Sequence, residues 1–306
     1  MKLKKIRNAL LVVLTLALVS AAAVAVTWAL NAPVMNTIIN DLSTPEMKVL
    51  LSEYKWDGVD SPIDPDSANH TDYTADTDAA KANQGKTKAN PYTLDTFEGK
   101  NQLIPKNPSL SNTSTAEPEF VAMTAYYEVD YKKTGDNTRT TAYLTQDQFT
   151  HSFASLYKDA AATTAGINTT DWEHDKKTLS DQDNTSRQID VYYFKGTVDS
   201  GEKGVLPQQK MTTTLFEAVD VNRLSPQSGN TGKYEIFNPN SATSTDKITI
   251  DDLPSFRIIL RGYAVQAANM DGADANARYD NAKTELDTLI AADVKATKFI
   301  PATFPD

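Results

Sequence analysis

The sequence predicts a mainly β protein, an antiparallel β-sandwich with inserted helices and long polar loops. Three observations carry this prediction. Several segments alternate apolar and polar residues at the period of two that strands require, most clearly Phe120–Tyr131. Only two stretches have helical spacing, and polar loops separate most of the apolar segments. Helices inserted into a strand-dominated chain of this length fit a sandwich with antiparallel pairing.

The first stretch, Met1–Ala29, predicts a secretory signal peptide. A short basic head precedes the uncharged, apolar run Ala9–Val26, and small residues lead to a polar boundary at Asn31. This order of basic, apolar and small residues is typical of an export signal. The basic residues of the head are Lys2, Lys4, Lys5 and Arg7.

The predicted cleavage site comprises Thr27, Trp28 and Ala29, with the cut after Ala29. Ala23–Ala25 offers a competing site. The alternative to cleavage is an uncleaved anchor, because the apolar run approaches the roughly 20 residues that span a bilayer. A positive head before an acidic body places residues 30–306 outside the cytoplasm in either case.

Net charge and the absence of cysteine exclude several kinds of partner and of catalytic or metal site. The chain has 30 basic and 40 acidic residues, a net charge of −10, and loss of the leader's four basic residues leaves 26 against 40, or −14. Nucleic acid and anionic lipid need a basic footprint and are disfavoured as partners. The absence of cysteine excludes disulfides, cysteine nucleophiles and thiolate metal sites, so stability must come from the core or from assembly.

The mature chain begins with a short apolar, β-branched segment, Ala32–Ile39, which the turn Asp41–Pro45 separates from the body. Met47–Glu53 is the next predicted strand. Asp57–Asn90 is rich in Asp, Ala, Asn, Thr and Lys, which predicts an exposed insertion. The predicted organisation is a leader (1–29), an N-terminal segment (30–40) and one sandwich domain (41–306).

The middle of the chain carries one strand and one helix. In Phe120–Tyr131, alternation puts one apolar set on a single face: Val121, Met123, Tyr127, Val129 and Tyr131. Thr145–Ala161 switches to helical spacing, and Thr145 followed by Gln148 predicts a capping box. Thr163–Ser186, around Trp172, predicts a polar loop.

The last third predicts further strands and a helix. Gln188–Val198 alternates with Ile189, Val191 and Tyr193 on one face, and Lys210–Val221 alternates again. The remaining elements are the strands Lys247–Ile250 and Ser255–Gln266 and a helix over Ala275–Val294.

Catalytic chemistry has few candidates, and the sequence predicts a non-enzymatic protein. The three histidines, His70, His151 and His174, form no His-Glu-x-x-His zinc motif, and no Gly-x-Ser-x-Gly elbow is present. The histidines are therefore interpreted as solvated loop or helix-surface residues. A hydrolase is the least supported class.

Oxygen ligands give two weak calcium candidates. Asp60, Asp64 and Asp66 lie in the acidic insertion, and Asp271, Asp274 and Asn276 form the second group. Calcium takes six to eight oxygen ligands, but neither spacing fits an EF-hand loop. The favoured interpretation is a pair of solvated acidic loops, so no cofactor is predicted.

Five aromatic residues are candidates for stacking on sugars of a matrix polysaccharide. Packing in the core or at the rim of a sandwich is the favoured alternative. They are Tyr54, Trp56, Trp172, Tyr192 and Phe194.

The order of several short motifs resembles TasA/camelysin-type exported proteins, which a dedicated SipW-type signal peptidase processes. The leader ending in Thr27–Ala29 is followed by a strand ending in Glu53 and by Trp56-Asp57. Pro108 and Asn112 then lead to a strand beginning Phe120-Val121. The later motifs are Val191–Lys195, Gly201–Pro207, Thr213–Phe216 and Tyr263–Ala267. The insertion 57–90, the helical stretch 145–161 and the segment 275–306 depart from the family pattern.

The resemblance implies a jelly-roll-like sandwich that assembles into cell-surface or biofilm-matrix fibres by donating its N-terminal strand to the next subunit. Ala32–Ile39 suits that role, because a detached apolar strand can complete a neighbour's sheet edge. The candidate assembly residues are Val34, Met35, Asn36, Thr37, Ile38 and Ile39. The alternatives are that this strand folds back into its own sheet or frays, and that the protein is a monomeric binding module for polysaccharide or surface ligands.

Overall fold

A computed structural model describes residues 24–28, 49–52, 103–198, 201–227, 232–241, 243 and 245–296. The prediction of a mainly β, antiparallel protein is confirmed, since every ladder between the described strands is antiparallel. The helical elements of this part of the chain are α4 (Gln146–Ser152), α5 (Ala275–Lys295) and a short 3₁₀ turn at Ala267–Asn269.

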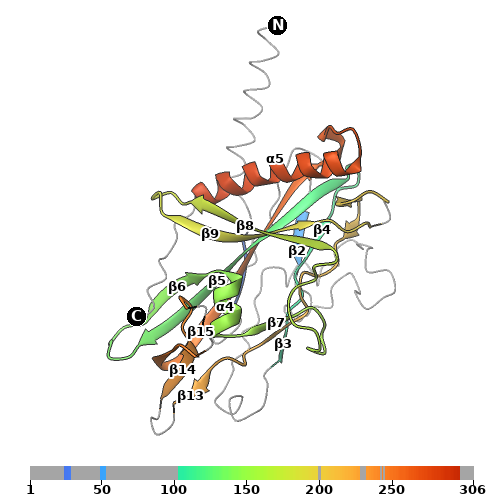
Figure 1. Ribbon diagram of the computed structural model, residues 1–306. Coiled ribbons are helices and arrows are strands. Elements are labelled where there is room, and N and C mark those ends of the chain that lie inside the picture. The colour runs from blue at the N-terminus through green and yellow to red at the C-terminus, as the bar shows by residue number, and fades with distance from the viewer. Residues whose placement is uncertain are drawn as a thin grey trace, which may run out of the picture.

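A nine-stranded sheet built around two long strands forms the centre of the fold (Figure 1). β5 (Glu119–Lys133) pairs with β15 (Lys247–Gln266). β15 is one strand that includes both predicted strands, 247–250 and 255–266, and its register with β5 shifts between Asp251 and Ser255. The sheet follows the order β13-β14-β15-β5-β9-β8, with β1, β6 and β10 paired beside it. These strands are β1 (Val24–Trp28), β6 (Thr140–Leu144), β8 (Trp172–Ser180), β9 (Ser186–Phe194), β10 (Val205–Leu206), β13 (Ser225–Pro226) and β14 (Lys233–Phe237).

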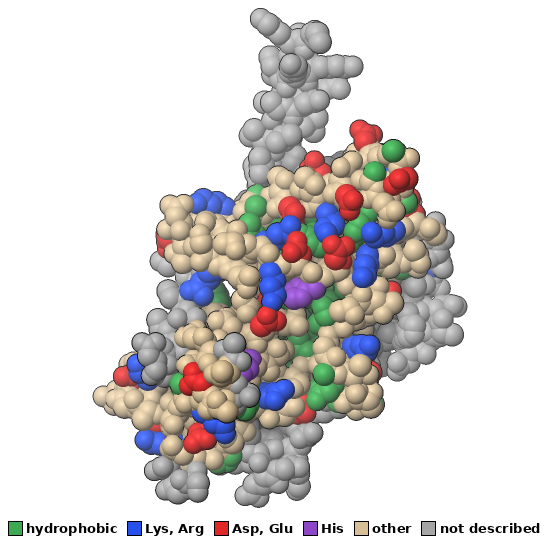
Figure 2. Space-filling model, in the orientation of Figure 1, with side chains coloured by type: hydrophobic (Ala, Val, Ile, Leu, Met, Phe, Trp, Pro, Cys, Tyr) green, Lys and Arg blue, Asp and Glu red, His purple; other side chains and the backbone are tan. Residues whose placement is uncertain are grey.

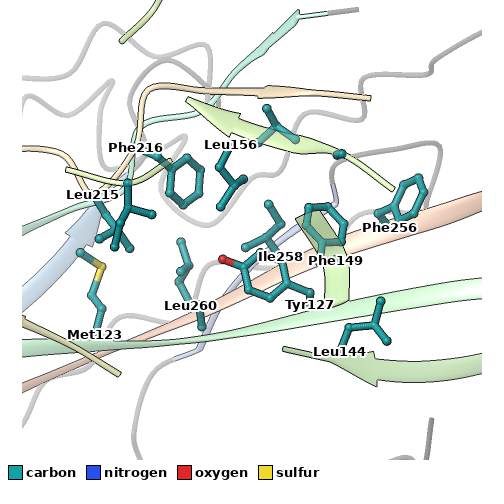
Figure 3. Packing of buried hydrophobic residues seen from close by; sticks show 14 of the residues in the cluster. Met123, Tyr127, Leu144, Phe149, Leu156, Leu215, Phe216, Phe256, Ile258 and Leu260 are labelled. Carbon is teal, nitrogen blue, oxygen red and sulfur yellow. The ribbon is translucent and has the colours of Figure 1, made fainter. Parts of the chain in front are cut away.

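Two three-stranded sheets pack on one face of the large sheet. One contains β11 (Lys210–Met211), β4 (Ser109–Asn112) and β2 (Val49–Ser52); the other contains β3 (Leu103–Pro105), β12 (Ala218–Asp220) and β7 (Ser155–Tyr157). Their apolar residues join the face of β5 that alternation predicts, and the core between them holds Met123, Tyr127 and Leu260 (Figure 3). Gly262 lets β4 approach closely, because a Cβ there would lie 2.7 Å from Leu110 Cδ2.

The opposite face of the large sheet is covered by α5 (Ala275–Lys295), which confirms the predicted C-terminal helix (Figure 1). Its buried residues Tyr279, Leu286 and Ile290 pack in a second core with the predicted face of β9, including Val191 and Tyr193. Glu128, on the polar face of β5, is buried as well.

The predicted helix Thr145–Ala161 is too long. α4 spans Gln146–Ser152, and its Thr145–Gln148 capping box is confirmed. The chain then enters β7, which pairs with β12, so Leu156 reaches the core from a strand. Strand pairing with a distant segment thus overrides the helical spacing.

The prediction of a polar loop at Thr163–Ser186 is wrong over its second half, which forms β8. All nine residues of β8 pair with β9, and Trp172 anchors the strand by donating from Nε1 to the Thr213 carbonyl at 3.1 Å. β8 lies at the end of the sheet and carries many polar side chains, so it lacks a clear apolar alternation. Backbone pairing and one buried aromatic hold it.

The prediction of one strand over Lys210–Val221 is also wrong. The chain forms only β11 and β12 there, because it crosses from one small sheet to the other. Leu215 and Phe216 fill the core at the crossing and are fully buried. Leu215 and Phe216 are therefore apolar because they are buried in the core, and not because they belong to a strand.

β2 confirms the strand predicted at Met47–Glu53. The segment Ala32–Ile39, the turn Asp41–Pro45 and the insertion 57–90 lie outside the described residues. None of the helices in the described part of the chain is long and apolar enough to cross a membrane.

Candidate functional site

The candidate site is the outer edge of β15 at Arg257–Arg261, the edge that faces away from β5. β5 pairs with β15 over Ser255–Gln266, and a strand has only two edges. β14 takes the outer edge at Lys247–Asp251, and β1 takes it at Arg257–Arg261. We call Arg257–Arg261 the outer edge below.

The outer edge has one apolar and one charged face. Ile258 and Leu260 belong to the main core and are fully buried. Arg257, Ile259 and Arg261 lie on the face toward α5, because side chains alternate along a strand. A strand paired here must therefore present alternate residues to two different surroundings.

Two buried ion pairs fix the charged face. Arg257 pairs with Glu128 of β5, and Arg261 pairs with Asp293 of α5. The Asp293 carboxylate also accepts a hydrogen bond of 2.7 Å from the Tyr263 hydroxyl. These contacts tie β15 to its neighbour strand and to the helix above it, so the edge is rigidly placed.

Burial and charge act in opposite directions on these groups. Burial raises the pKa of Glu128, although Arg257 counteracts it by favouring the carboxylate. Burial by itself would lower the pKa of Arg261, but Tyr263, Asp293 and Tyr126 raise it above its usual range. Arg261 therefore stays charged, and its guanidinium carbon lies 5.7 Å from the centre of the Tyr126 ring.

The occupant of the outer edge is β1, Val24–Trp28, whose register runs antiparallel from Val24 opposite Arg261 to Trp28 opposite Arg257. Two predicted cleavage-site residues, Thr27 and Trp28, thus lie in a strand, while Ala29 is outside the described residues. This strand was not predicted, because strand alternation is hidden within the apolar run Ala9–Val26. The β-branched residues at alternate positions, Val24 and Val26, were the available signal.

The predicted donor residues Val34, Met35, Asn36, Thr37, Ile38 and Ile39 lie outside the described residues. The structure therefore brings to the site the segment just before the donor, together with the sheet edge that sequence reasoning did not locate.

The calcium candidates gain no support in the described residues. Asp60, Asp64 and Asp66 lie outside them. Asp274 is the N-cap of α5, and its Oδ1 accepts from the Ala277 backbone N–H at 2.9 Å. The described part of the chain contains no group of three or more His, Asp or Glu side chains placed to hold a metal ion.

The two described histidines both lie near α4, while His70 is outside the described residues. His174 Nε2 lies 2.8 Å from Oδ1 of the fully buried Asp190, and the His174 ring stacks on Tyr192 with centroids 4.8 Å apart. Asp190 Oδ2 also accepts from the Gln146 backbone N–H at 2.6 Å. The interpretation of His174 as a solvated loop residue is wrong, because it lies in β8 and its ring contacts a buried carboxylate and the buried Tyr192.

A cavity of about 510 Å³ lies beside α4 and is lined by His151, Ser155 and Arg223 among others. His151 is a half-buried residue on the surface of α4, and its ring packs against Phe237 with centroids 5.4 Å apart. Its Nε2 is buried and makes no hydrogen bond within the described structure. Ser155 Oγ instead donates to Asn222 Oδ1 at 3.0 Å, so no serine–histidine dyad forms here.

The described aromatic candidates are core residues. Trp172, Tyr192 and Phe194 are almost completely buried, and the Trp172 and Phe194 rings meet edge to face at 5.4 Å. Stacking of these three on polysaccharide is therefore wrong, and packing is their role. Tyr54 and Trp56 lie outside the described residues.

Opposite charges alternate where α5 crosses β8 and β9 (Figure 2). Lys283 pairs with Glu173, and Lys177 pairs with both Asp175 and Asp287. The pairs Lys283–Glu173 and Lys177–Asp287 join α5 to β8, whereas Lys177–Asp175 lies within β8.

Comparison with known proteins found no matching family model, no matching curated protein and no matching solved structure.

Proposed function

We propose that this chain is a secreted structural subunit that polymerises into cell-surface or biofilm-matrix fibres by strand donation. The observation that carries the proposal is the occupancy of the outer edge of β15. Its occupant, β1, belongs to the leader that cleavage after Ala29 would remove. The mature chain would then present an unfilled edge, and its new N-terminus would be the apolar segment 30–40.

An edge without its strand is strongly disposed to pair. Without β1, the backbone N–H and C=O groups of Arg257–Arg261 that face it lose their partners, while those that face β5 stay paired. Burying the unpaired groups costs free energy. The edge continues from β14 along the same side of β15, so an incoming strand extends an existing sheet. Backbone hydrogen bonds then supply affinity, and alternate side chains supply specificity.

The two faces of the edge select a register for the donor. Met35, Thr37 and Ile39 share one face of the predicted strand, whereas Val34 and Asn36 share the other. Asn36 suits the side of Arg257 and Arg261, because an amide beside Ile258 and Leu260 would be buried without partners. We therefore assign Thr37 to the apolar side.

Donation from one subunit to the next is a head-to-tail contact. Such a contact does not close on itself and generates filaments. The ordered motifs that resemble TasA/camelysin-type proteins support the same architecture, a jelly-roll-like fibre subunit exported through a signal peptidase. The acidic body, which disfavours nucleic acid as a partner, is compatible with matrix polysaccharide as a neighbour in the fibre.

The test is negative-stain electron microscopy of residues 30–306, with Thr37→Asp and Asn36→Asp as matched variants. Both add one negative charge, at adjacent positions on opposite faces of the donor strand. We expect wild type and Asn36→Asp to form regular filaments and Thr37→Asp to stay monomeric, because a carboxylate cannot be buried beside Leu260 without a large cost.

Deletion of Leu30–Asn40 is expected to abolish filaments as well. Filaments that survive this deletion, or monomers of the wild-type mature chain at every concentration, would contradict strand donation.

A second candidate function is binding of a polar surface ligand in the cavity beside α4. The specific observation is the buried, unpartnered Nε2 of His151 next to the exposed Arg223. These groups suit a carboxylated sugar, because a guanidinium pairs with carboxylates. Calorimetry with a uronic-acid oligosaccharide tests this: binding should survive deletion of Leu30–Asn40 and be lost in Arg223→Gln, while no heat with the wild type rules it out.

A further inference from the structure

The segment Val24–Trp28 belongs to the predicted leader, yet it completes the sheet of its own chain. It forms five consecutive register pairs with Arg257–Arg261. It takes the same side of β15 as β14, so the precursor has no gap at the edge where the proposed donor would bind.

We infer that the leader caps the strand-accepting edge in the precursor, so that removal of Val24–Trp28 makes the subunit competent to assemble. This inference rests on the proposed function for the identity of the incoming strand. The cap itself rests on the pairing of β1 with β15.

Tethering makes the cap effective. A strand in the same chain pairs in an intramolecular step that needs no second molecule, whereas a donor strand on another subunit competes at its bulk concentration. The covalently attached β1 therefore excludes the donor until the connection is cut. Cleavage converts the cap into a separate peptide that is diluted away.

The position of the cut decides whether the cap leaves. Cleavage after Ala29 removes the complete strand Val24–Trp28 in one piece. Cleavage at the competing Ala23–Ala25 site would leave Val26–Trp28, three of the five paired residues, at the mature N-terminus. The cut after Ala29 is thus the one that empties the edge.

The test uses the full chain in mild detergent, with a site for a sequence-specific protease inserted between Ala29 and Leu30. Assembly is followed by light scattering and electron microscopy before and after the protease is added. Amide hydrogen exchange is measured over Arg257–Arg261 in the same samples. We expect no filaments before cleavage, filaments after it, and at least about tenfold faster exchange of the amides that face β1 in monomers trapped by Thr37→Asp.

Two proline variants of the uncut chain provide matched controls. Val26→Pro interrupts β1, because proline cannot donate to a ladder and is poorly accommodated inside a strand. Val13→Pro makes the same change in the leader outside β1. We expect the uncut Val26→Pro chain to assemble and the uncut Val13→Pro chain to remain capped.

The outcomes separate this inference from the proposed function. If uncut chain assembles as fast as cut chain, or if exchange over Arg257–Arg261 is the same before and after cleavage, the cap is overturned. If cleavage speeds exchange but no filaments form, the cap stands and the fibre proposal fails.

Discussion

Single residues in this protein are constrained most strongly where opposite charges are buried between β5 and β15. Glu128 and Arg257 come from neighbouring strands and pair with only 4% and 16% of their side chains exposed. Removing one member of a buried pair leaves the other charge uncompensated, whereas removing both removes the desolvation cost as well. Such a pair fixes register between β5 and β15 more than it adds stability.

We expect Glu128→Leu alone to lower the free energy of unfolding by about 3–5 kcal/mol, because Arg257 is left buried without its carboxylate. The double variant Glu128→Leu/Arg257→Met should recover most of that loss. Urea unfolding of the two single variants and the double variant measures the coupling. Additive losses would show that the pair is effectively solvated.

Asp220 gives a prediction about pH. This carboxylate of β12 is 1% exposed, its Oδ1 makes no hydrogen bond within the described structure, and burial raises its pKa although Asn222 donates to Oδ2. The folded state thus holds the proton more tightly than the unfolded state. Its contribution to stability is present below the ordinary carboxyl pKa and is lost as pH rises through the raised value.

Asp220→Asn removes this dependence, so its unfolding midpoint should improve relative to wild type between about pH 4 and about pH 7. Asp159→Asn is the control of opposite sign. Backbone hydrogen bonds from Thr163 and Thr164 lower the pKa of Asp159, so that variant should lose stability relative to wild type as pH rises toward about 5, with parallel curves above it. Parallel pH curves for Asp220→Asn and wild type would contradict the prediction.

At the scale of elements, α5 depends on close packing against the turn before β10. Gly204 has φ +77°, and a Cβ there would lie 2.5 Å from Tyr279 Cδ2 of the helix and 3.0 Å from the Phe194 carbonyl oxygen. The Lys203 ammonium lies 4.2 Å from the centre of the same tyrosine ring. This turn therefore packs directly against α5.

Gly204→Ala should destabilise the protein by about 2–4 kcal/mol, which combines overpacking with the strain of positive φ. Gly201→Ala is the matched control: φ is +64° there, but no atom lies within 4 Å of the added Cβ. We therefore expect Gly201→Ala to cost only the strain of alanine at positive φ, about 1 kcal/mol. If urea unfolding gives the same loss of unfolding free energy for both variants, the close contact with Tyr279 does not contribute to the effect.

At the scale of the whole molecule, net charge opposes assembly. Loss of the four basic residues of the predicted leader would take the chain from −10 to −14, so like-charged subunits would approach one another in the proposed fibre. Salt screens this repulsion, with a Debye length of about 10 Å at 0.1 M. In the proposed assembly, the charge of the acidic body therefore opposes contact between subunits until their strands pair.

We expect filament growth of residues 30–306 to speed up as salt rises from about 10 mM to about 150 mM and then to level off. Light scattering at fixed protein concentration measures the rate. The monomeric Thr37→Asp variant serves as the control for non-specific salting out. Growth that slows with salt would indicate that attraction between opposite charges drives the contact.

The sequence by itself determined the elements whose pattern is local. The apolar faces of β5 and β9 follow from alternation at period two, and α5 and the capping box of α4 follow from helical spacing and an N-cap residue. Each depends on residues a few positions apart, so the pattern is complete within the segment.

The tertiary structure decided the elements that exist only through a distant partner. β8 is a polar strand held by β9, α4 ends where β7 pairs with β12, and the apolar residues after β11 fill a core instead of a ladder. β1 is the clearest case, since only the outer edge of β15 turns part of an apolar leader into a strand. Backbone pairing across a sheet depends on which edge is open, and a local sequence pattern does not contain that information.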